Sequence, residues 1–154
     1  MHQIFHSPAL TAEPADYERD FAQWIEHQAE LLRLKDFERL DLINLVEEIE
    51  DMGKSIKHEL SSRLEVLILH LLKCEFQPEH KSSSWTGSIG EQRSQISRKL
   101  KQSPSLKRFV MEYASECYEA AVIRAANDTG LPEGLFPRTL PYSEEQLLNM
   151  RYIP

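Results

Sequence analysis

The spacing of apolar residues most constrains the fold of this chain, because it follows the period of an α-helix. In the segment from Asp16 to about Lys35, apolar side chains recur over four turns at Tyr17, Phe21, Trp24, Ile25, Leu31 and Leu32. Residues three and four apart share one face of a helix, so this spacing predicts an amphipathic helix that Asp16 caps. No segment shows the strict alternation that is typical of a half-buried strand.

The same spacing predicts further helices, which glycine, proline and capping residues separate. We expect them at 38–52 (closed by Gly53), at 54–77 (ended by Pro78), at 88–102 (opened by Ser88) and at 104–127 (opened by Ser103 and Pro104). Three later prolines predict an extended strap, and Ser143 with Gln146 predicts a last short helix. The expected fold is an all-α helical bundle of about five main helices, with a C-terminal extended strap and a short helix.

Length and segment composition predict the domain organisation and the compartment. With 154 residues, the chain fits a single helical domain over 16–154, preceded by a flexible N-terminal arm at 1–15 that lacks periodicity. That arm has no apolar run of the kind found in signal peptides, and the apolar stretch 66–72 is too short to span a membrane. Cys74 and Cys117 fall on apolar faces, where thiols act as small hydrophobic groups, so we expect no disulfide and a cytoplasmic location.

The helix expected at 54–77 is apolar on two faces from Leu64 onward. Val66, Leu69 and Phe76 lie opposite the stripe that includes Leu71. A helix that is apolar nearly all round must be buried on several sides. Either it is the central helix of the bundle, or its second face packs on another subunit; we expect a homodimer through this second face.

Arg93 is the most informative polar residue, because it falls at the centre of the apolar stripe of the helix at 88–102. An arginine that faces a core must be paired, since an isolated buried charge is very costly. Glu48 and Glu50 flank the apolar face of the helix at 38–52, and His70 lies at the border of another stripe. The sequence therefore predicts a partly buried polar cluster, which either binds a ligand or only fixes the register of the helices, formed by Glu48, Glu50, His70, Trp85 and Arg93.

Catalytic and metal-binding patterns are missing from the sequence. Di-iron bundles use Glu-x-x-His on two helices, and this chain contains no Glu-x-x-His, no Cys-x-x-Cys and no His-Glu-x-x-His. It also lacks Gly-x-Ser-x-Gly and a glycine-rich phosphate loop. We therefore expect no metal and no cofactor, and the sequence identifies no catalytic residue.

The net charge of −7 is the sum of unlike parts. Residues 1–79 carry −9, residues 80–108 carry +6 and residues 109–154 carry −4. The acidic total argues against general binding to nucleic acid or to an anionic membrane. The basic helix at 88–102 could bind nucleic acid, but Trp85 is the only aromatic residue of the basic segment, and single-strand binders usually interleave several.

The chain also contains a set of short motifs whose order and spacing resemble those of a known family. They are Glu47-Glu48-Ile49-Glu50 with Gly53, Arg63-Leu64-Glu65, His70-Leu71-Leu72-Lys73, Gln77-Pro78, Trp85, Ile89-Gly90-Glu91-Gln92-Arg93, Ser103-Pro104-Ser105-Leu106 and Thr129-Gly130-Leu131-Pro132. In order and spacing they resemble the bacterial domain-of-unknown-function family twenty-nine, from roughly Asp16 to the end of the chain. The resemblance implies a helical, bundle-like fold in a bacterial cytosolic protein, and it implies no activity.

These observations leave three function classes open. The first is a non-enzymatic interaction module that recognises another protein through a helical face or through the Trp85 loop. The second is a small-molecule-binding protein or enzyme that uses the cluster of Glu48, His70 and Arg93. The third, and least favoured, is nucleic-acid binding by the basic helix at 88–102.

Overall fold

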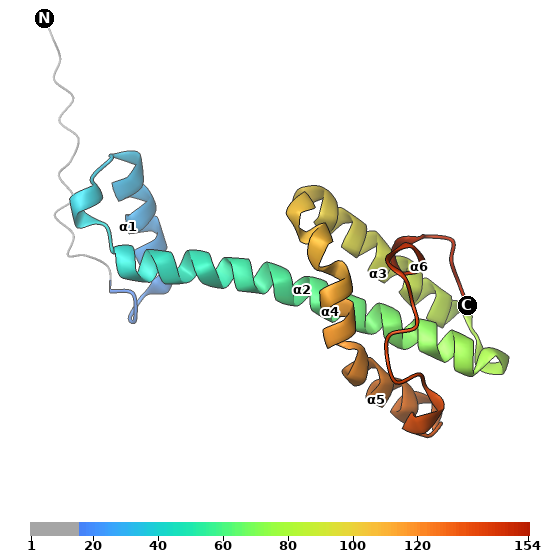
Figure 1. The fold of residues 1–154 in the computed structure, drawn as a ribbon. Helices are drawn as coiled ribbons and strands as arrows, with labels where there is room; N and C mark the ends of the chain where they lie inside the picture. Colours follow the sequence, from blue (N-terminus) through green and yellow to red (C-terminus); the bar gives the residue numbers. More distant parts are fainter. Residues whose placement is uncertain (1–15) are drawn as a thin grey trace, which may run out of the picture. The chain divides into compact units, whose positions relative to one another are not determined.

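The computed structural model describes residues 16–154, and the arm expected at 1–15 lies outside this range. The described residues form α-helices joined by short 3-10 turns and contain no strand, which confirms the all-α prediction (Figure 1). The α-helices are α1 (Phe21–Arg33), α2 (Leu42–Phe76), α3 (Ser83–Gln102), α4 (Val110–Glu116), α5 (Tyr118–Thr129) and α6 (Glu144–Leu148). The 3-10 turns are η1 (Phe37–Arg39), η2 (Pro78–His80), η3 (Pro104–Phe109) and η4 (Glu133–Leu135).

The chain divides into two compact units between Met52 and Gly53. The N-terminal unit, described from residue 16 to residue 52, contains α1, η1 and the first turns of α2. The C-terminal unit, Gly53–Pro154, contains the rest of α2 and all later elements. Since α2 contributes to both units, the single domain over 16–154 stays a prediction.

Helix α2 replaces the two helices that were predicted at 38–52 and 54–77. Gly53 lies inside α2 and does not end it. A glycine in a helix interior costs only about 1 kcal/mol of helix stability relative to alanine. Good helix formers on both sides outweigh that cost. Gly130 does end a helix: it adopts φ 74° after α5, and its N–H donates to the carbonyl of Ala126.

Three other predicted boundaries also move. Asp20, rather than Asp16, caps α1, since its carboxylate accepts from the N–H of Gln23 at 3.0 Å. Helix α3 begins after Ser82, six residues before the predicted Ser88, so Trp85 lies in its first turn and not in a loop. The helix predicted at 104–127 is divided into η3, α4 and α5. The capping box of the last short helix, α6, is confirmed.

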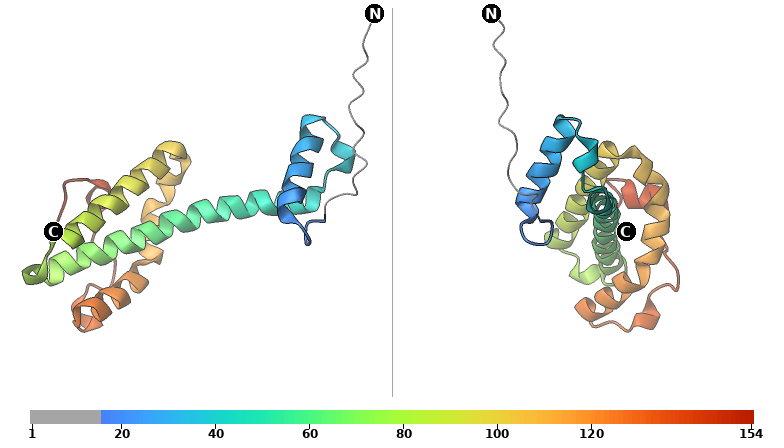
Figure 2. Two further views of the ribbon diagram at one scale, coloured as in Figure 1. Left: turned by 180° about the vertical axis from the view of Figure 1, so that it is seen from behind. Right: turned by 90° about the vertical axis from the view of Figure 1, so that its left-hand side faces the viewer.

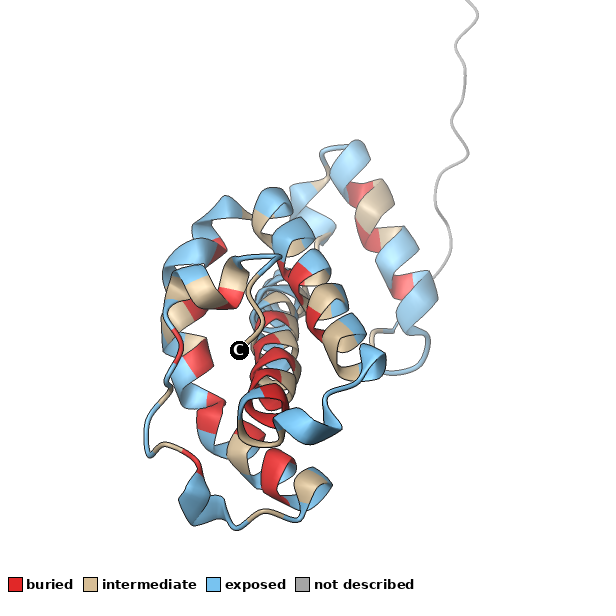
Figure 3. Cartoon of the chain, turned by 90° about the vertical axis from the view of Figure 1, so that its right-hand side faces the viewer, coloured by how far each residue is buried: buried red, intermediate tan, exposed pale blue. Residues whose placement is uncertain are grey.

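The second half of α2 is the central helix of the C-terminal unit. Figure 2 shows α3 and α5 on different sides of it, and Figure 3 shows buried residues concentrated along it. Nine residues of α2 from Leu60 to Cys74 are buried. Leu69 is 2% exposed, and the ring of Phe76 packs against Phe136 at 5.2 Å between centroids. The segment after α5 thus covers part of the face on which we expected a homodimer, Val66 and Phe76 stay half-buried there, and the homodimer stays a prediction.

The N-terminal unit has little core and is held by polar contacts. Trp24, Gln28 and Leu31 are the buried residues of α1. The carboxylate of Asp41 accepts from the indole N–H of Trp24 at 3.1 Å and from the side-chain amide of Asn44 at 2.7 Å, and the main-chain N–H of Asp41 donates to Gln28 at 2.8 Å. These bonds, that from Asn44 above all, hold the pKa of Asp41 below its ordinary value. Asp41 thus joins α1 to the start of α2.

Candidate functional site

Arg93 is buried as predicted, with 1% exposure, but its partners are not carboxylates. Its guanidinium donates to the main-chain carbonyls of Gln146 (2.7 Å), Leu147 (2.9 Å) and Tyr152 (2.5 Å). The last carbonyls of a helix have no partner within it, and α6 ends at Leu148, so a buried fork of donors satisfies them. The predicted pairing with Glu48 or Glu50 is therefore wrong, and Arg93 holds the C-terminal segment onto α3.

Glu48 and Glu50 both lie on the part of α2 that belongs to the N-terminal unit. Glu48 accepts from the hydroxyl of Tyr17 at 2.5 Å, and this bond raises the pKa of Tyr17 to about 12. Glu50 is exposed. The other three predicted cluster residues, His70, Trp85 and Arg93, belong to the C-terminal unit.

Trp85 contacts Lys73, a residue to which the sequence analysis gave no role, whereas His70 bonds within its own helix. Lys73 is buried, with its ammonium 2.9 Å from the carboxylate of Asp128 and 4.7 Å from the centre of the Trp85 ring. The Nδ1 of half-buried His70 lies 2.9 Å from the carbonyl of Val66 in its own helix. The ammonium is already neutralised by its carboxylate and stacked on an aromatic ring, an arrangement that fixes α2 against α3 and α5.

An apolar groove lies in the N-terminal unit, between α1 and the first turns of α2. It has a volume of about 260 Å³. It is lined by Phe21, Trp24, Ile25, Gln28, Ala29, Leu32, Leu45, Glu48, Ile49 and Met52. Of the thirteen large apolar side chains exposed in the described residues, ten lie between Phe21 and Met52. The periodicity of both segments predicts amphipathic helices, but it does not predict that their apolar faces stay exposed.

The comparisons with known proteins give one match. Residues 17–153 match the model of the family described as Domain of unknown function DUF29. The chain belongs to this family. The match extends over both units of the DUF29 chain, and it confirms the resemblance drawn from the motifs. No curated protein and no solved structure matches the chain.

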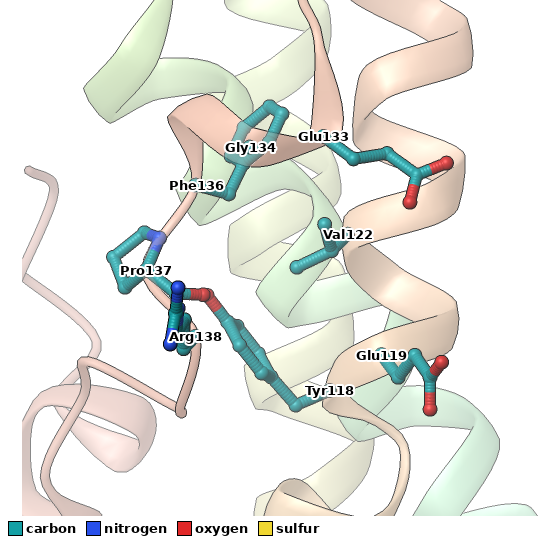
Figure 4. Close-up of a pocket in the computed structure, with 8 residues that line it drawn as sticks. All are labelled: Tyr118, Glu119, Val122, Glu133, Gly134, Phe136, Pro137 and Arg138. Carbon is teal, nitrogen blue, oxygen red and sulfur yellow. The ribbon is translucent and has the colours of Figure 1, made fainter.

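A hollow of about 470 Å³ lies beside α5 of the DUF29 chain. The side chains that line it do not form an arrangement typical of a catalytic site. Figure 4 shows the side chains of Glu119 and Glu133 extending on the side opposite Arg138. The hydroxyl of Tyr118 already donates to the carbonyl of Pro137 at 2.8 Å. Between residues 16 and 154, no three histidine, cysteine or acidic side chains lie where they could hold a metal ion.

The basic segment at 80–108 of the DUF29 chain uses most of its charges internally. Lys99 pairs with Glu59, Lys107 lies 3.8 Å from Glu144, and Lys81 donates to the carbonyl of Pro154 at 2.8 Å. Since Arg93 is also buried, less positive charge faces solvent than the sequence count suggests. Among the described helices, none has both the length and the hydropathy that crossing a bilayer requires.

We predict a pH dependence of stability that arises at His70. Burial lowers the pKa of its imidazole; Lys73 and Arg124 add to this shift, whereas the Val66 carbonyl and Asp128 oppose it. The fold therefore favours the neutral ring, so its contribution is complete above the ordinary pKa of about 6.5 and is lost as the pH falls through the folded-state pKa. Between pH 7.5 and 5, the free energy of unfolding should fall more for the wild type than for His70→Gln, by at most about 1.4 kcal/mol per pH unit. Urea denaturation at each pH measures this free energy. An equal fall for the two proteins over this pH range would contradict the prediction.

We also predict that the two cysteines are inert in the native chain. Cys74 and Cys117 are free and buried, which confirms their prediction as small core groups. Burial raises both thiol pKa values, that of Cys117 to about 12, so little thiolate is present near neutral pH. A colorimetric thiol reagent should react at least about a hundredfold more slowly with the native chain than with the chain in guanidinium chloride. Rapid reaction of one thiol in the native chain is the contrary result.

Proposed function

We propose that this DUF29 chain is a non-enzymatic protein-interaction module, which holds a helix of another protein in the apolar groove of its N-terminal unit. The observation that carries the proposal is the concentration of exposed apolar side chains on α1 and the first turns of α2. Contiguous exposed apolar surface on a folded protein usually marks an interaction site. The groove is lined mainly by aliphatic and aromatic side chains and presents few polar groups to a substrate.

The spacing of the lining residues suits a helix as the occupant. Phe21, Ile25 and Leu32 lie along one side of α1, and Ile49 and Met52 lie along one side of α2. A third helix packs into such a surface through apolar residues at i, i+3, i+4 and i+7. Each large apolar side chain that becomes buried contributes about 1.5–3 kcal/mol to the gross binding free energy.

The small core of the N-terminal unit also supports the proposal. Its described part has 37 residues, and only two of its large apolar side chains, Trp24 and Leu31, are buried. Chain segments below about 40 residues rarely bury enough surface to be stable without help. A bound helix would supply the missing apolar contacts.

Selection from a helical peptide library tests the proposal. A phage-displayed library carries helices of about 18 residues with a fixed apolar stripe, and their other positions are randomised among Lys, Glu, Gln and Ser. The full chain is the bait. Enriched peptides should bind the double variant Ile25→Gln/Ile49→Gln at least about tenfold more weakly than the wild type, because two apolar contacts of the groove are lost.

A matched control uses Ile123→Gln/Leu135→Gln, which changes two exposed apolar side chains of the C-terminal unit. This variant should bind the peptides as the wild type does. Circular dichroism checks that both double variants keep their helix content. If no peptide is enriched, or if the enriched peptides bind all three proteins equally, the groove is not a helix-binding site.

The proposed module acts in the cytoplasm of a bacterium. The free thiols of Cys74 and Cys117 support a reducing compartment, since cytosolic proteins keep their cysteines reduced. The bacterial origin rests on the resemblance of the motifs alone. Fractionation of cells that express the chain with its native ends would test the location.

A further inference from the structure

We infer that the partner helix is basic: an amphipathic helix whose apolar stripe is flanked by lysine or arginine. This inference rests on the proposed function, and it adds the chemistry that would select one helix among many. It comes from the charge of the N-terminal unit, which is independent of the apolar groove.

The negative charge of the chain is concentrated in the unit that carries the groove. Residues 16–52 contain twelve acidic and four basic side chains, a formal charge of −8. Residues 53–154 contain twelve acidic and fourteen basic side chains, a formal charge of +2. The groove thus lies in a strongly negative field, which raises the encounter rate with cationic partners and lowers it with anionic ones.

Three of the four cations of this unit lie beside its own carboxylates. Arg33 lies 3.0 Å from Glu30, and Arg39 lies 2.6 Å from Asp36. Arg19 lies 3.8 Å from Asp16. Each pair cancels within the unit. Nine carboxylates and Lys35 remain, so the unit still presents a net negative charge to a partner.

Carboxylates also lie in and beside the groove itself. On α2, half-buried Glu48 is one of the residues that line it. On α1, exposed Glu26 lies beyond Ala29 at the outer border of the groove. Cations that flank the apolar stripe of a docked helix would meet these carboxylates.

The same charges disfavour the other possible occupants. A second copy would bring two units of −8 together, so the homodimer expected from the sequence gains no support at this surface. Residues 1–15 of the chain contain no lysine or arginine. An anionic membrane would be repelled.

The enriched library peptides test the inference directly. We expect an excess of lysine over glutamate at the randomised positions next to the apolar stripe. The most enriched peptide is synthesised as selected and with every lysine replaced by glutamate. At about 50 mM salt the glutamate version should bind the full chain at least about tenfold more weakly than the lysine version. The difference in affinity between the two peptides should become smaller toward about 1 M salt.

Variants of the carboxylates in and beside the groove provide the reciprocal test. Glu26→Gln/Glu48→Gln should weaken binding of the lysine peptide about threefold to tenfold at low salt, and a glutamine at position 48 can still accept from the hydroxyl of Tyr17. Glu112→Gln/Glu116→Gln, a matched pair of exposed carboxylates on α4, should leave it unchanged. Both variants keep the apolar groove, so the comparison isolates the charge.

The outcomes separate this inference from the proposed function. Enriched peptides that need Ile25 and Ile49 but carry no excess of lysine would overturn the basic partner and leave the helix-binding groove in place. Sedimentation of the wild type as a dimer, with the Ile25→Gln/Ile49→Gln variant as a monomer, would make a second copy the occupant and overturn the inference. Displacement of the lysine peptide by a synthetic peptide of residues 1–15, at a similar concentration, would overturn it too.

Discussion

Replacing Arg93 with methionine should lower the free energy of unfolding of the C-terminal unit by about 3–5 kcal/mol. Methionine fills much of the same space but donates no hydrogen bond. The carbonyls of Gln146, Leu147 and Tyr152 would lose their donor in a site where Arg93 is 1% exposed. Urea denaturation followed by Trp85 fluorescence, in a Trp24→Phe background, measures the loss in this unit.

Two further variants show whether the effect arises from hydrogen bonding. Arg98→Met removes an exposed arginine of the same helix and should change the free energy of unfolding by no more than about 0.5 kcal/mol. Arg93→Lys keeps the charge but cannot donate to three carbonyls in a plane, so it should lose most of the stability that Arg93→Met loses. A small loss in Arg93→Met would contradict the role of Arg93 in holding the C-terminal segment.

Leu67→Ala should destabilise the chain by about 2–5 kcal/mol, because it leaves a cavity on the fully buried face of α2. Ile43→Ala, on the same helix, removes a side chain that is 83% exposed and should change the free energy of unfolding by no more than about 0.5 kcal/mol. The same urea experiment measures Leu67→Ala, and Trp24 fluorescence in a Trp85→Phe background measures Ile43→Ala.

The contrast between these two variants tests how α2 is used. Both residues are large and aliphatic, and both lie on apolar faces of one helix. If Ile43→Ala cost as much as Leu67→Ala, the first turns of α2 would be part of a packed core on that side of the helix. Because Ile43 is not among the residues that line the groove, addition of an enriched library peptide should leave the cost of Ile43→Ala unchanged.

Much of the fold could be predicted from periodicity, because apolar spacing reports which face of a helix is buried. It placed Arg93 among buried residues and located the short helix α6 through its capping box. It failed at Gly53, since a glycine signals a possible helix end and cannot show whether the neighbouring turns carry the helix through. It also failed on the partners of Arg93, because every residue has a carbonyl and the sequence does not mark the unsatisfied ones.

The candidate site could be predicted only in part, for a related reason. The apolar stripes of α1 and of the first turns of α2 were evident, but a stripe does not reveal what covers it. Glu50 was singled out as a partner for a buried cation and lies exposed beside Val46. Lys73 and Asp128 are 55 residues apart, so nothing in their local sequence indicated that they pair.

Because both units share α2, we expect the two units to have evolved together in this family. The division between the units falls inside a helix, not in a linker, so a chain recombined at that point would have to continue one helix across the join. The DUF29 match runs unbroken from residue 17 to residue 153, as expected if the two units are transmitted as one gene segment.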